Sequence, residues 1–328
     1  MRPTADDNAR TVRPGTRSRW RRGWPLAVVA GLVAGLLAFP SAVPNAGPRL
    51  GSLVETFLPW LGLVIPVLLG LALLRRSLPA LLATLLPAAV WVGLIAPAPA
   101  ADRETPGTGL TAVQHNVSDE NPDPAGTGKA LLAVRPDLVA LVEVTPAALP
   151  AYLAALAPEL PHHAVQGTVG LWSRYPLADA RPLDIKPSGL AADWRRALRA
   201  TARTPYGEIA VYVAHLPSVR LGVSTGFGTA RRDESAARLG AAIRAERLET
   251  VLLLGDLNST LDDRGLDPVG SQLTSPRTRL PFSWPAGFPV ARVDQVMARS
   301  ATVARVRALP ATGSDHLPIT ARVHLPDG

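Results

Sequence analysis

The chain contains no cysteine in its 328 residues. Disulfide bonds and thiolate metal sites are therefore excluded, and redox chemistry of thiols with them. The absence is compatible with either side of a cell membrane and does not choose between them. The sequence also lacks an internal repeat of fixed period, so no repeat architecture is indicated.

The larger, C-terminal part of the chain lacks an excess of charge of either sign. Residues 101–328 hold 24 basic and 23 acidic side chains, although the whole chain carries a net charge of +8. Much of that excess belongs to residues 1–23, which contain seven arginines and two aspartates. A near-neutral domain argues against binding nucleic acid by bulk electrostatics.

Residues 24–97 have few charged side chains and contain three long apolar segments. Their lengths predict a membrane anchor with helices over 24–40, 53–74 and 78–96, although the first is slightly short for a span. Arginines are concentrated in the arm 1–23 and in the Arg75-Arg76 turn. The positive-inside rule therefore places these two segments on the cytoplasmic side. Residues 98–108 read as a tether, and 109–328 as a domain on the extracellular side of the bilayer. A cleaved signal peptide is the alternative for the first segment, and it leaves the domain outside as well.

Residues 109–328 mix hairpin-like strand pairs with helices. Strands at 196–203 and 208–215 flank a turn-like tetrapeptide, and a long helix is expected over 230–249. This mixture favours a two-sheet α/β sandwich with outer helices over a parallel doubly wound sheet. Residues 222–228 and 257–288 are expected to be long functional loops. Further strands are expected at 110–117, 138–144, 169–173, 250–255, 292–297, 302–309 and 317–323, and helices at 128–134 and 146–156.

Polar side chains stand at the ends of several apolar strands. Glu143 follows an apolar run, and a carboxylate there is costly to bury unless it is paired or binds a metal. Asp256 and Asn258 follow the run 251–254, and strand alternation predicts that both point to one face. Asn116 and His215 end two other strands and are expected at the same edge. Each has an ordinary structural explanation alone, as a turn, cap or core residue.

An acid and a histidine in the last third of the chain complete the set. Asp294 is a lone acid in an apolar strand, and Asp315 and His316 precede Leu317-Pro318. We expect Asp294 to pair with His316, because an acid aligned on a histidine fixes its tautomer and raises its basicity. His115 neighbours the site, but strand alternation points it away from the face of Asn116.

These residues, in this order along the chain, resemble the endonuclease/exonuclease/phosphatase superfamily. That superfamily includes DNase I-like nucleases, inositol polyphosphate phosphatases and neutral sphingomyelinases. The resemblance covers about residues 109–325 and implies a four-layer α/β sandwich of the DNase I-like type. It rests on Gln114-His-Asn116, Pro136-Asp-Leu-Val-Ala-Leu-Val-Glu143, Trp172-Ser-Arg-Tyr-Pro176, Ala214-His-Leu216, Gly255-Asp-Leu-Asn258, Arg292-Val-Asp294 and Ser314-Asp-His316.

The resemblance implies a divalent cation, Mg²⁺ with Mn²⁺ as the alternative. Glu143 is its implied principal ligand, with Asn116 and Asp315 nearby.

The resemblance also implies in-line hydrolysis of a phosphoester. Asp256 and His316, the latter aligned by Asp294, position or deprotonate the attacking water, and the division of base duty between them is left open. Asn258 and His215 hold the phosphate and stabilise the charge on the leaving oxygen.

The apolar segments carry a second resemblance. The three segments, with Val43-Pro-Asn45 and Glu55-Thr-Phe-Leu-Pro-Trp-Leu61, are similar to VanJ-type membrane proteins associated with teicoplanin resistance. The leading expectation is therefore a membrane-tethered phosphohydrolase, with the lipid bilayer and a phosphorylated lipid or cell-envelope substrate as partners. An extracellular nuclease is the first alternative, with Arg195, Arg196, Arg199 and Arg203 as a local basic patch. A non-catalytic envelope-binding resistance module is the second.

Overall fold

The computed structural model describes residues 23–96, 109–223, 226–276 and 281–325. The chain forms two compact units. The first contains the described residues up to Phe39 together with Pro59–Leu94, and the second contains Pro40–Leu58 and the chain from Ile95 onward. The predicted tether, 98–108, and all of the basic arm except Gly23 lie outside the described residues.

The first unit is built from apolar helices. They are α2 (Trp24–Ala38), α4 (Val64–Leu74) and α5 (Leu78–Ile95), with the 3₁₀ turn η2 (Leu58–Leu63) before α4. By length and composition, α5 can cross a membrane, with a mean hydropathy of 2.1 and 17% of its residues buried. Helix α2 is shorter than a span.

The expected second span, 53–74, is not one continuous helix. Helix α3 (Leu50–Thr56) is bent by 74° from the helical stretch Leu58–Leu74, and the two qualify as a span only if the bent pair is counted as one. Glu55 of α3 is buried in the second unit, where its carboxylate pairs with Arg264. The described part of the chain therefore offers one candidate span, or two with the bent pair, where three were expected.

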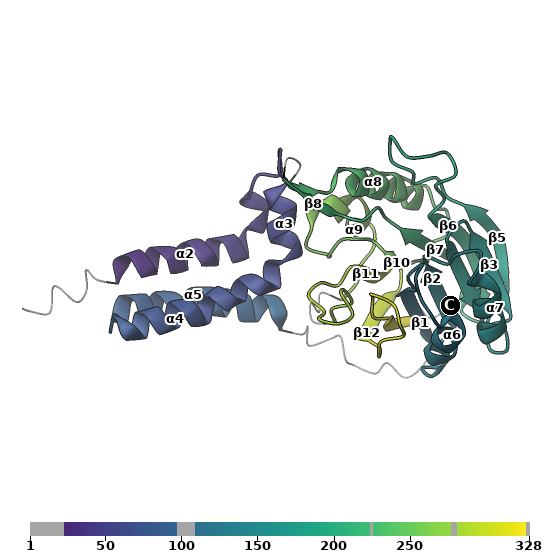
Figure 1. The fold of residues 1–328 in the computed structure, drawn as a ribbon, viewed down its shortest axis with the longest axis horizontal. Helices are drawn as coiled ribbons and strands as arrows, with labels where there is room; N and C mark the ends of the chain where they lie inside the picture. The colour runs from purple at the N-terminus through teal and green to yellow at the C-terminus, as the bar shows by residue number, and fades with distance from the viewer. Residues whose placement is uncertain (1–22, 97–108, 224–225, 277–280, 326–328) are drawn as a thin grey trace, which may run out of the picture. The chain divides into compact units, whose positions relative to one another are not determined.

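The second unit contains two large mixed sheets (Figure 1). In the six-stranded sheet, β1 and β2 pair in parallel, and its other neighbours are antiparallel. The spatial order of its strands is β12 (Thr302–Ala308), β13 (Ile319–His324), β1 (Gly109–Asn116), β2 (Leu138–Val142), β4 (Val169–Ser173) and β3 (His162–Gln166).

The five-stranded sheet also contains one parallel pair, β10 with β7. Its order is β11 (Asp294–Arg299), β10 (Val251–Asp256), β7 (Gly207–His215), β6 (Ala197–Thr204) and β5 (Leu177–Pro182). A small two-stranded sheet joins β8 (Arg220–Gly222) to β9 (Gly226–Gly228), within a stretch expected to be a loop. The second expected loop, 257–288, contains η3 (Arg264–Leu266) and α9 (Asp267–Gly270).

The two large sheets pack face to face, with helices on both outer surfaces. The central core joins apolar side chains of both sheets, such as Leu138 and Val213. Helices α6 (Pro124–Leu132) and α7 (Leu149–Leu156) cover the six-stranded sheet, while α8 (Ala230–Arg244) and α9 cover the other (Figure 1). The four-layer α/β sandwich is therefore confirmed.

The strand register brings the expected site residues to one edge. Asn116 is opposite Val142, one residue before Glu143, across the parallel β1–β2 pair. Asp256 is opposite His215 on one side and Asp294 on the other. The carboxyl ends of β1, β2, β7 and β10 therefore deliver polar side chains to the same region.

Candidate functional site

Asn116 links two acidic side chains at the centre of the site. Its amide Nδ2 donates to Glu143 Oε1 at 3.1 Å and to Asp256 Oδ2 at 3.0 Å. Its Oδ1 accepts from the backbone N–H of Ser118 at 3.0 Å. Two carboxylates from different sheets are thereby held against one amide.

Asp256 is 1% exposed and accepts a second hydrogen bond, from the backbone N–H of Asn258 at 2.9 Å. Burial is the main cause that raises the pKa of its carboxyl to about 7, although the charge of His316 and two hydrogen bonds oppose the shift. Burial therefore favours the neutral form of this carboxyl group.

His215 faces the same two carboxylates from the end of β7. Its Nε2 lies 3.6 Å from Glu143 Oε1 and 3.7 Å from Asp256 Oδ2. Burial, and then the positive charge of Arg196, lower the pKa of this imidazole well below its ordinary value. Arg196 Nη1 lies 3.2 Å from Nδ1 and 3.4 Å from Nε2 of this ring. A guanidinium can only donate, so we assign the nearer Nδ1 as its acceptor, and the neutral ring then presents Nε2–H to the acidic cluster.

The expected pair of Asp294 and His316 is present. His316 Nδ1 donates to Asp294 Oδ2 at 2.7 Å, and His316 Nε2 lies 3.7 Å from Asp256 Oδ2. Burial alone lowers the pKa of His316, but the negative charges of Asp294 and Asp256 outweigh it and raise the pKa above its ordinary value. The hydrogen bond to Asp294 fixes the tautomer and directs Nε2 toward Asp256.

His316 reaches the site from a loop before β13, whereas the other site residues follow strands. Ser314 holds this loop in place, because its hydroxyl donates to the carbonyl of Asn116 at 2.7 Å and accepts from the backbone N–H of His316 at 3.0 Å. Sequence reasoning assigned no role to Ser314.

Two predicted site residues adopt left-handed backbone conformations. Glu143 has φ +64° and Asn258 has φ +46°, a region that costs a non-glycine residue about 1 kcal/mol or more. Glu143 lies one residue beyond β2, and Asn258 lies two residues beyond β10.

Asn258 and Asp315 lie differently from expectation. Strand β10 ends at Asp256, so alternation does not extend to Asn258, whose Nδ2 donates to the carbonyl of Leu216 at 2.9 Å. Asp315 is exposed and influences His316 through its charge, while its backbone carbonyl accepts from Ala286. Asn116, Glu143, His215, Asp256, Asp294 and His316 are brought together; the described structure does not draw the Asp315 carboxylate into that cluster.

His115 does point away from this cluster. It is fully buried, and its Nε2 lies 2.7 Å from the hydroxyl of Thr312.

The donor set suits a hard divalent cation. Asp256, Asp294 and His316 offer ligand atoms within 4.8 Å of one another, and Glu143 shares the Asn116 amide with Asp256. Asp294 Oδ1 is buried without a hydrogen-bond partner among the described residues. Carboxylate oxygens are the preferred ligands of Mg²⁺, and clustered carboxylates that share one amide would gain from a positive charge.

The sequence pattern of the endonuclease/exonuclease/phosphatase family matches residues 113–316, more than half of the chain. The chain belongs to this family. The matched region contains all eight predicted site residues. No curated protein is similar enough in sequence to count as a match.

Solved structures of similar fold cover about two thirds of this family member. Sphingomyelinase C from Streptomyces griseocarneus is 16% identical, with 66% of this chain and 99% of that chain covered and a TM-score of 0.50. D. rerio TDP2, solved with a single-strand DNA product, is 18% identical, with 66% and 100% covered and a TM-score of 0.53. A beta toxin variant from Staphylococcus aureus, solved with bound magnesium ions, is 14% identical, with 67% and 100% covered and a TM-score of 0.50. At these identities the likeness shows the fold alone.

One basic residue of the family member's site was not singled out from the sequence. Arg196 contacts His215, and its guanidinium lies 5.6 Å from the centre of the Trp194 ring. The sequence placed Arg196 in a four-arginine patch, but the structure disperses that patch. Arg199 is buried against Glu246, and Arg203 pairs with Glu208 on the surface. A signal for Arg196 was its position directly before β6, opposite the end of β7 where His215 stands.

Proposed function

We propose that this chain is a metal-dependent hydrolase of phosphoesters. The observation that carries the proposal is the position of Asp256, whose Oδ2 lies between the Asn116 amide at 3.0 Å and the rings of His215 and His316 at 3.7 Å. Family membership and the clustered oxygen ligands support it. A site made of carboxylates, an amide and two imidazoles can bind a phosphate, hold a water and move a proton.

Glu143, with Asp256, Asp294 and His316 close by, would hold Mg²⁺ or Mn²⁺. When bound, the cation supplies positive charge that neutralises the phosphoryl oxygens in the transition state. Neutral His215 donates Nε2–H to a phosphoryl oxygen. Arg196 keeps that ring in the required tautomer.

Water attacks phosphorus while the ester oxygen departs, and the water proton passes to the enzyme. Asp256 Oδ2 and His316 Nε2 are the two candidate acceptors, 3.7 Å apart. Asp294 stabilises the imidazolium that forms if His316 takes the proton. The leaving oxygen is protonated in turn, so one water is consumed and one P–O bond is broken.

A lipid-linked or cell-envelope phosphoester is the substrate class we propose, cleaved at the outer face of the membrane. The support comes from α5, which is long, apolar and mostly unburied, unlike the core helix of a soluble protein. Anchoring the domain to a bilayer concentrates it at a two-dimensional substrate. The similarity of residues 43–45 and 55–61 to VanJ-type proteins extends the proposal to glycopeptide resistance.

The nuclease alternative is weaker because the basic patch it needs is dispersed. Two of its four arginines, Arg199 and Arg203, are neutralised by Glu246 and Glu208. The non-catalytic alternative gives no reason for buried acids and histidines to converge at one sheet edge.

The test uses the full chain in lipid nanodiscs, assayed with Mg²⁺ and with EDTA. Undecaprenyl pyrophosphate, a chromogenic phosphodiester and plasmid DNA are the three substrates. We expect Mg²⁺-dependent hydrolysis of the lipid substrate that is lost in Asp256→Asn and kept in the exposed control Asp193→Asn. Cleavage of plasmid DNA alone, weakening steeply with salt, would establish the nuclease instead. Hydrolysis of none of the three would contradict the proposal.

A further inference from the structure

The connector Pro40–Leu58, which joins α2 to η2 along the chain, belongs to the second unit and contacts the catalytic half directly. Its Glu55 is 2% exposed and accepts from three groups of Arg264 at 2.7–3.0 Å: Nη2, Nε and the backbone N–H. A glutamate next to an apolar segment is thus used as an anchor point on the loop that follows β10.

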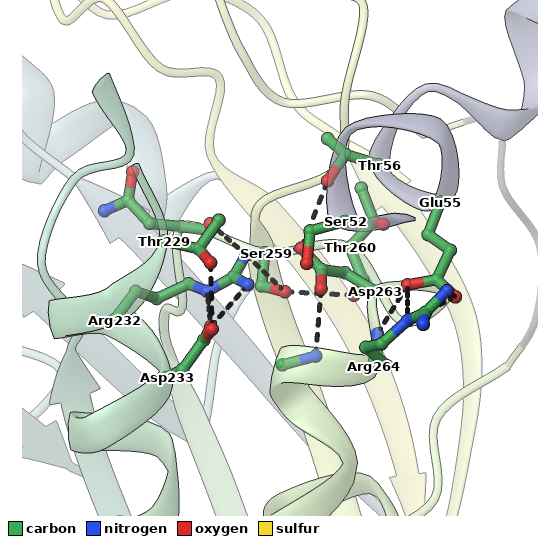
Figure 2. Close-up of polar contacts among 12 residues, drawn as sticks. Ser52, Glu55, Thr56, Thr229, Arg232, Asp233, Ser259, Thr260, Asp263 and Arg264 are labelled. Carbon is green, nitrogen blue, oxygen red and sulfur yellow. Dashed lines mark hydrogen bonds and ion pairs between the residues drawn. The ribbon is translucent and has the colours of Figure 1, made fainter. Parts of the chain in front are cut away.

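A second contact lies one residue further along the connector. The hydroxyl of Thr56 donates to Asp263 Oδ2 at 3.2 Å, in a buried setting (Figure 2). The same carboxylate oxygen accepts from Arg232 Nη1 at 2.5 Å. Asp263 therefore receives hydrogen bonds from the connector on one side and from α8 on the other.

Arg232 links Asp263 to the candidate site. It is 1% exposed, and its Nη1 also donates to Ser259 Oγ at 3.2 Å and to the carbonyl of Asn258 at 3.4 Å (Figure 2). The backbone N–H of Asn258 in turn donates to Asp256 Oδ1 at 2.9 Å. A continuous set of contacts thus runs from Thr56 to the carboxylate of Asp256.

The network is balanced in charge and tightly packed. Arg49, Arg232 and Arg264 are opposed by Glu55, Asp233 and Asp263. A Cβ added at Gly51 would lie 2.8 Å from the Arg264 guanidinium and 2.9 Å from the carbonyl of Val43. Buried pairs of this kind fix geometry, since removing one partner leaves a charge without compensation.

These contacts stabilise the left-handed backbone conformation of Asn258. A residue with φ +46° keeps that conformation only when its surroundings enforce it. Arg232 binds its carbonyl, Leu216 accepts from its side chain, and Asp256 accepts from its N–H. Loss of the support from Arg232 and Asp263 would release the loop end that bears Asn258.

We propose that the connector Pro40–Leu58 is a positioning element of the active site. Glu55 binds Arg264 and Thr56 binds Asp263, and these two contacts fix the loop 257–266. Arg232 bonds to Asp263 and to the Asn258 carbonyl. The loop position therefore determines where Asn258 lies next to Asp256. The catalytic part of this inference rests on the proposed phosphoester hydrolysis. Glu55, Thr56, Asp263 and Arg232 are positioning residues, since none of them needs to touch the substrate.

Amide hydrogen exchange on the full chain in nanodiscs tests the contact without any reaction. The Arg264 amide donates to Glu55 and the Asn258 amide to Asp256, so peptides covering 257–266 report both ends of the network. Glu55→Ala is expected to speed exchange there about tenfold, because local opening becomes easier. Arg238→Ala is the matched control, since it removes only an exposed pair with Glu234 on α8.

The same variants are then assayed for hydrolysis below their unfolding temperatures. Glu55→Ala is expected to lower kcat about tenfold or more with KM within about twofold, because misplacement affects the transition state most. If Glu55→Ala does not fold, Thr56→Val takes its place, and Thr56→Ser, which keeps the hydroxyl, should restore both exchange and kcat.

Two results would overturn the inference. One is unchanged exchange over 257–266 in Glu55→Ala and Thr56→Val; the other is faster exchange with unchanged kcat, which would leave the connector a purely structural role. If the wild-type chain hydrolyses no phosphoester, the proposed function fails, and the exchange data still decide whether the connector holds the loop.

Discussion

The carboxylate of Asp294 accepts a 2.7 Å hydrogen bond from Nδ1 of His316, and both side chains are buried. The two residues come from β11 and from the loop before β13, and 22 positions separate them. Their contact determines which ring nitrogen of His316 faces Asp256.

Replacing Asp294 by Asn keeps the shape and removes the charge. The amide can no longer stabilise an imidazolium, and it can donate to Nδ1 and reverse the tautomer of His316. We expect kcat to fall about a thousandfold or more. Initial rates under saturating Mg²⁺ measure the effect, with Asp193→Asn as the exposed control. A loss of less than about tenfold would mean that His316 takes no part in the proton transfer.

Stability should fall in acid because of a site remote from the catalytic cluster. Burial alone raises the pKa of Glu246, but hydrogen bonds from Arg199, the Leu248 backbone and Tyr212 outweigh it and lower the pKa to about 2. A lowered folded-state pKa stabilises the protein above the unfolded-state value, and the gain is lost as pH falls from about 4.5 toward 2. The stability difference between wild type and Glu246→Gln should shrink by roughly 2 kcal/mol between pH 6 and pH 3.

Chemical denaturation at the two pH values measures that difference. A gap that stays constant would show that Glu246 keeps an ordinary carboxyl pKa despite its 2.9 Å contact with Arg199.

Gly255 is required by the approach of two strands. A Cβ at this position would lie 2.0 Å from the carbonyl oxygen of Ala214 on β7. We expect Gly255→Ala to separate β10 from β7 and to cost about 3 kcal/mol or more, with loss of activity because Asp256 follows directly. Gly270→Ala is the control, since no atom outside its own local chain lies within 4 Å of the added carbon. Equal unfolding midpoints for the two variants would contradict the strand packing.

A shortened chain that begins at residue 109 should be less stable than the full chain. It lacks the connector, so Arg264 loses Glu55 and Asp263 loses Thr56. Hydrogen bonds to charged groups contribute about 1.5–3 kcal/mol each, and we expect a total loss of about 3 kcal/mol for these two contacts. Denaturation of both forms in the same detergent measures it. Identical stability would show that the connector contributes nothing to the fold.

The site residues at strand ends were predictable because the sequence patterns that mark them are local. An apolar run followed by an acid located Glu143 and Asp256, and the parallel pairs then brought their strand ends together. Expected helices shifted where caps were missed: α6 begins at Pro124 because the Asp123 side chain accepts from the Gly126 N–H at 2.8 Å.

Apart from the Asp294–His316 pair, long-range partners were not predictable from these patterns. Glu55 falls within the expected span 53–74, whereas its partner Arg264 is 209 positions away. Alternation failed at Asn258 because the strand ends two residues earlier. Arg196 contacts His215, whereas Arg199 and Arg203 pair with glutamates, and the composition of the arginine patch does not show this difference. Periodicity reports which face a residue occupies, and it carries no information about which distant residue meets it.

Binding of Mn²⁺ to the full chain, followed by electron paramagnetic resonance and competed with Mg²⁺, tests the central claim most directly. The account predicts binding that Mg²⁺ displaces, that weakens at least about tenfold in Glu143→Gln and Asp256→Asn, and that is unchanged in Asp193→Asn. An Mn²⁺ affinity that is unchanged in Glu143→Gln and Asp256→Asn, or no Mn²⁺ binding at all, would contradict a metal-dependent site at this edge of the sheets.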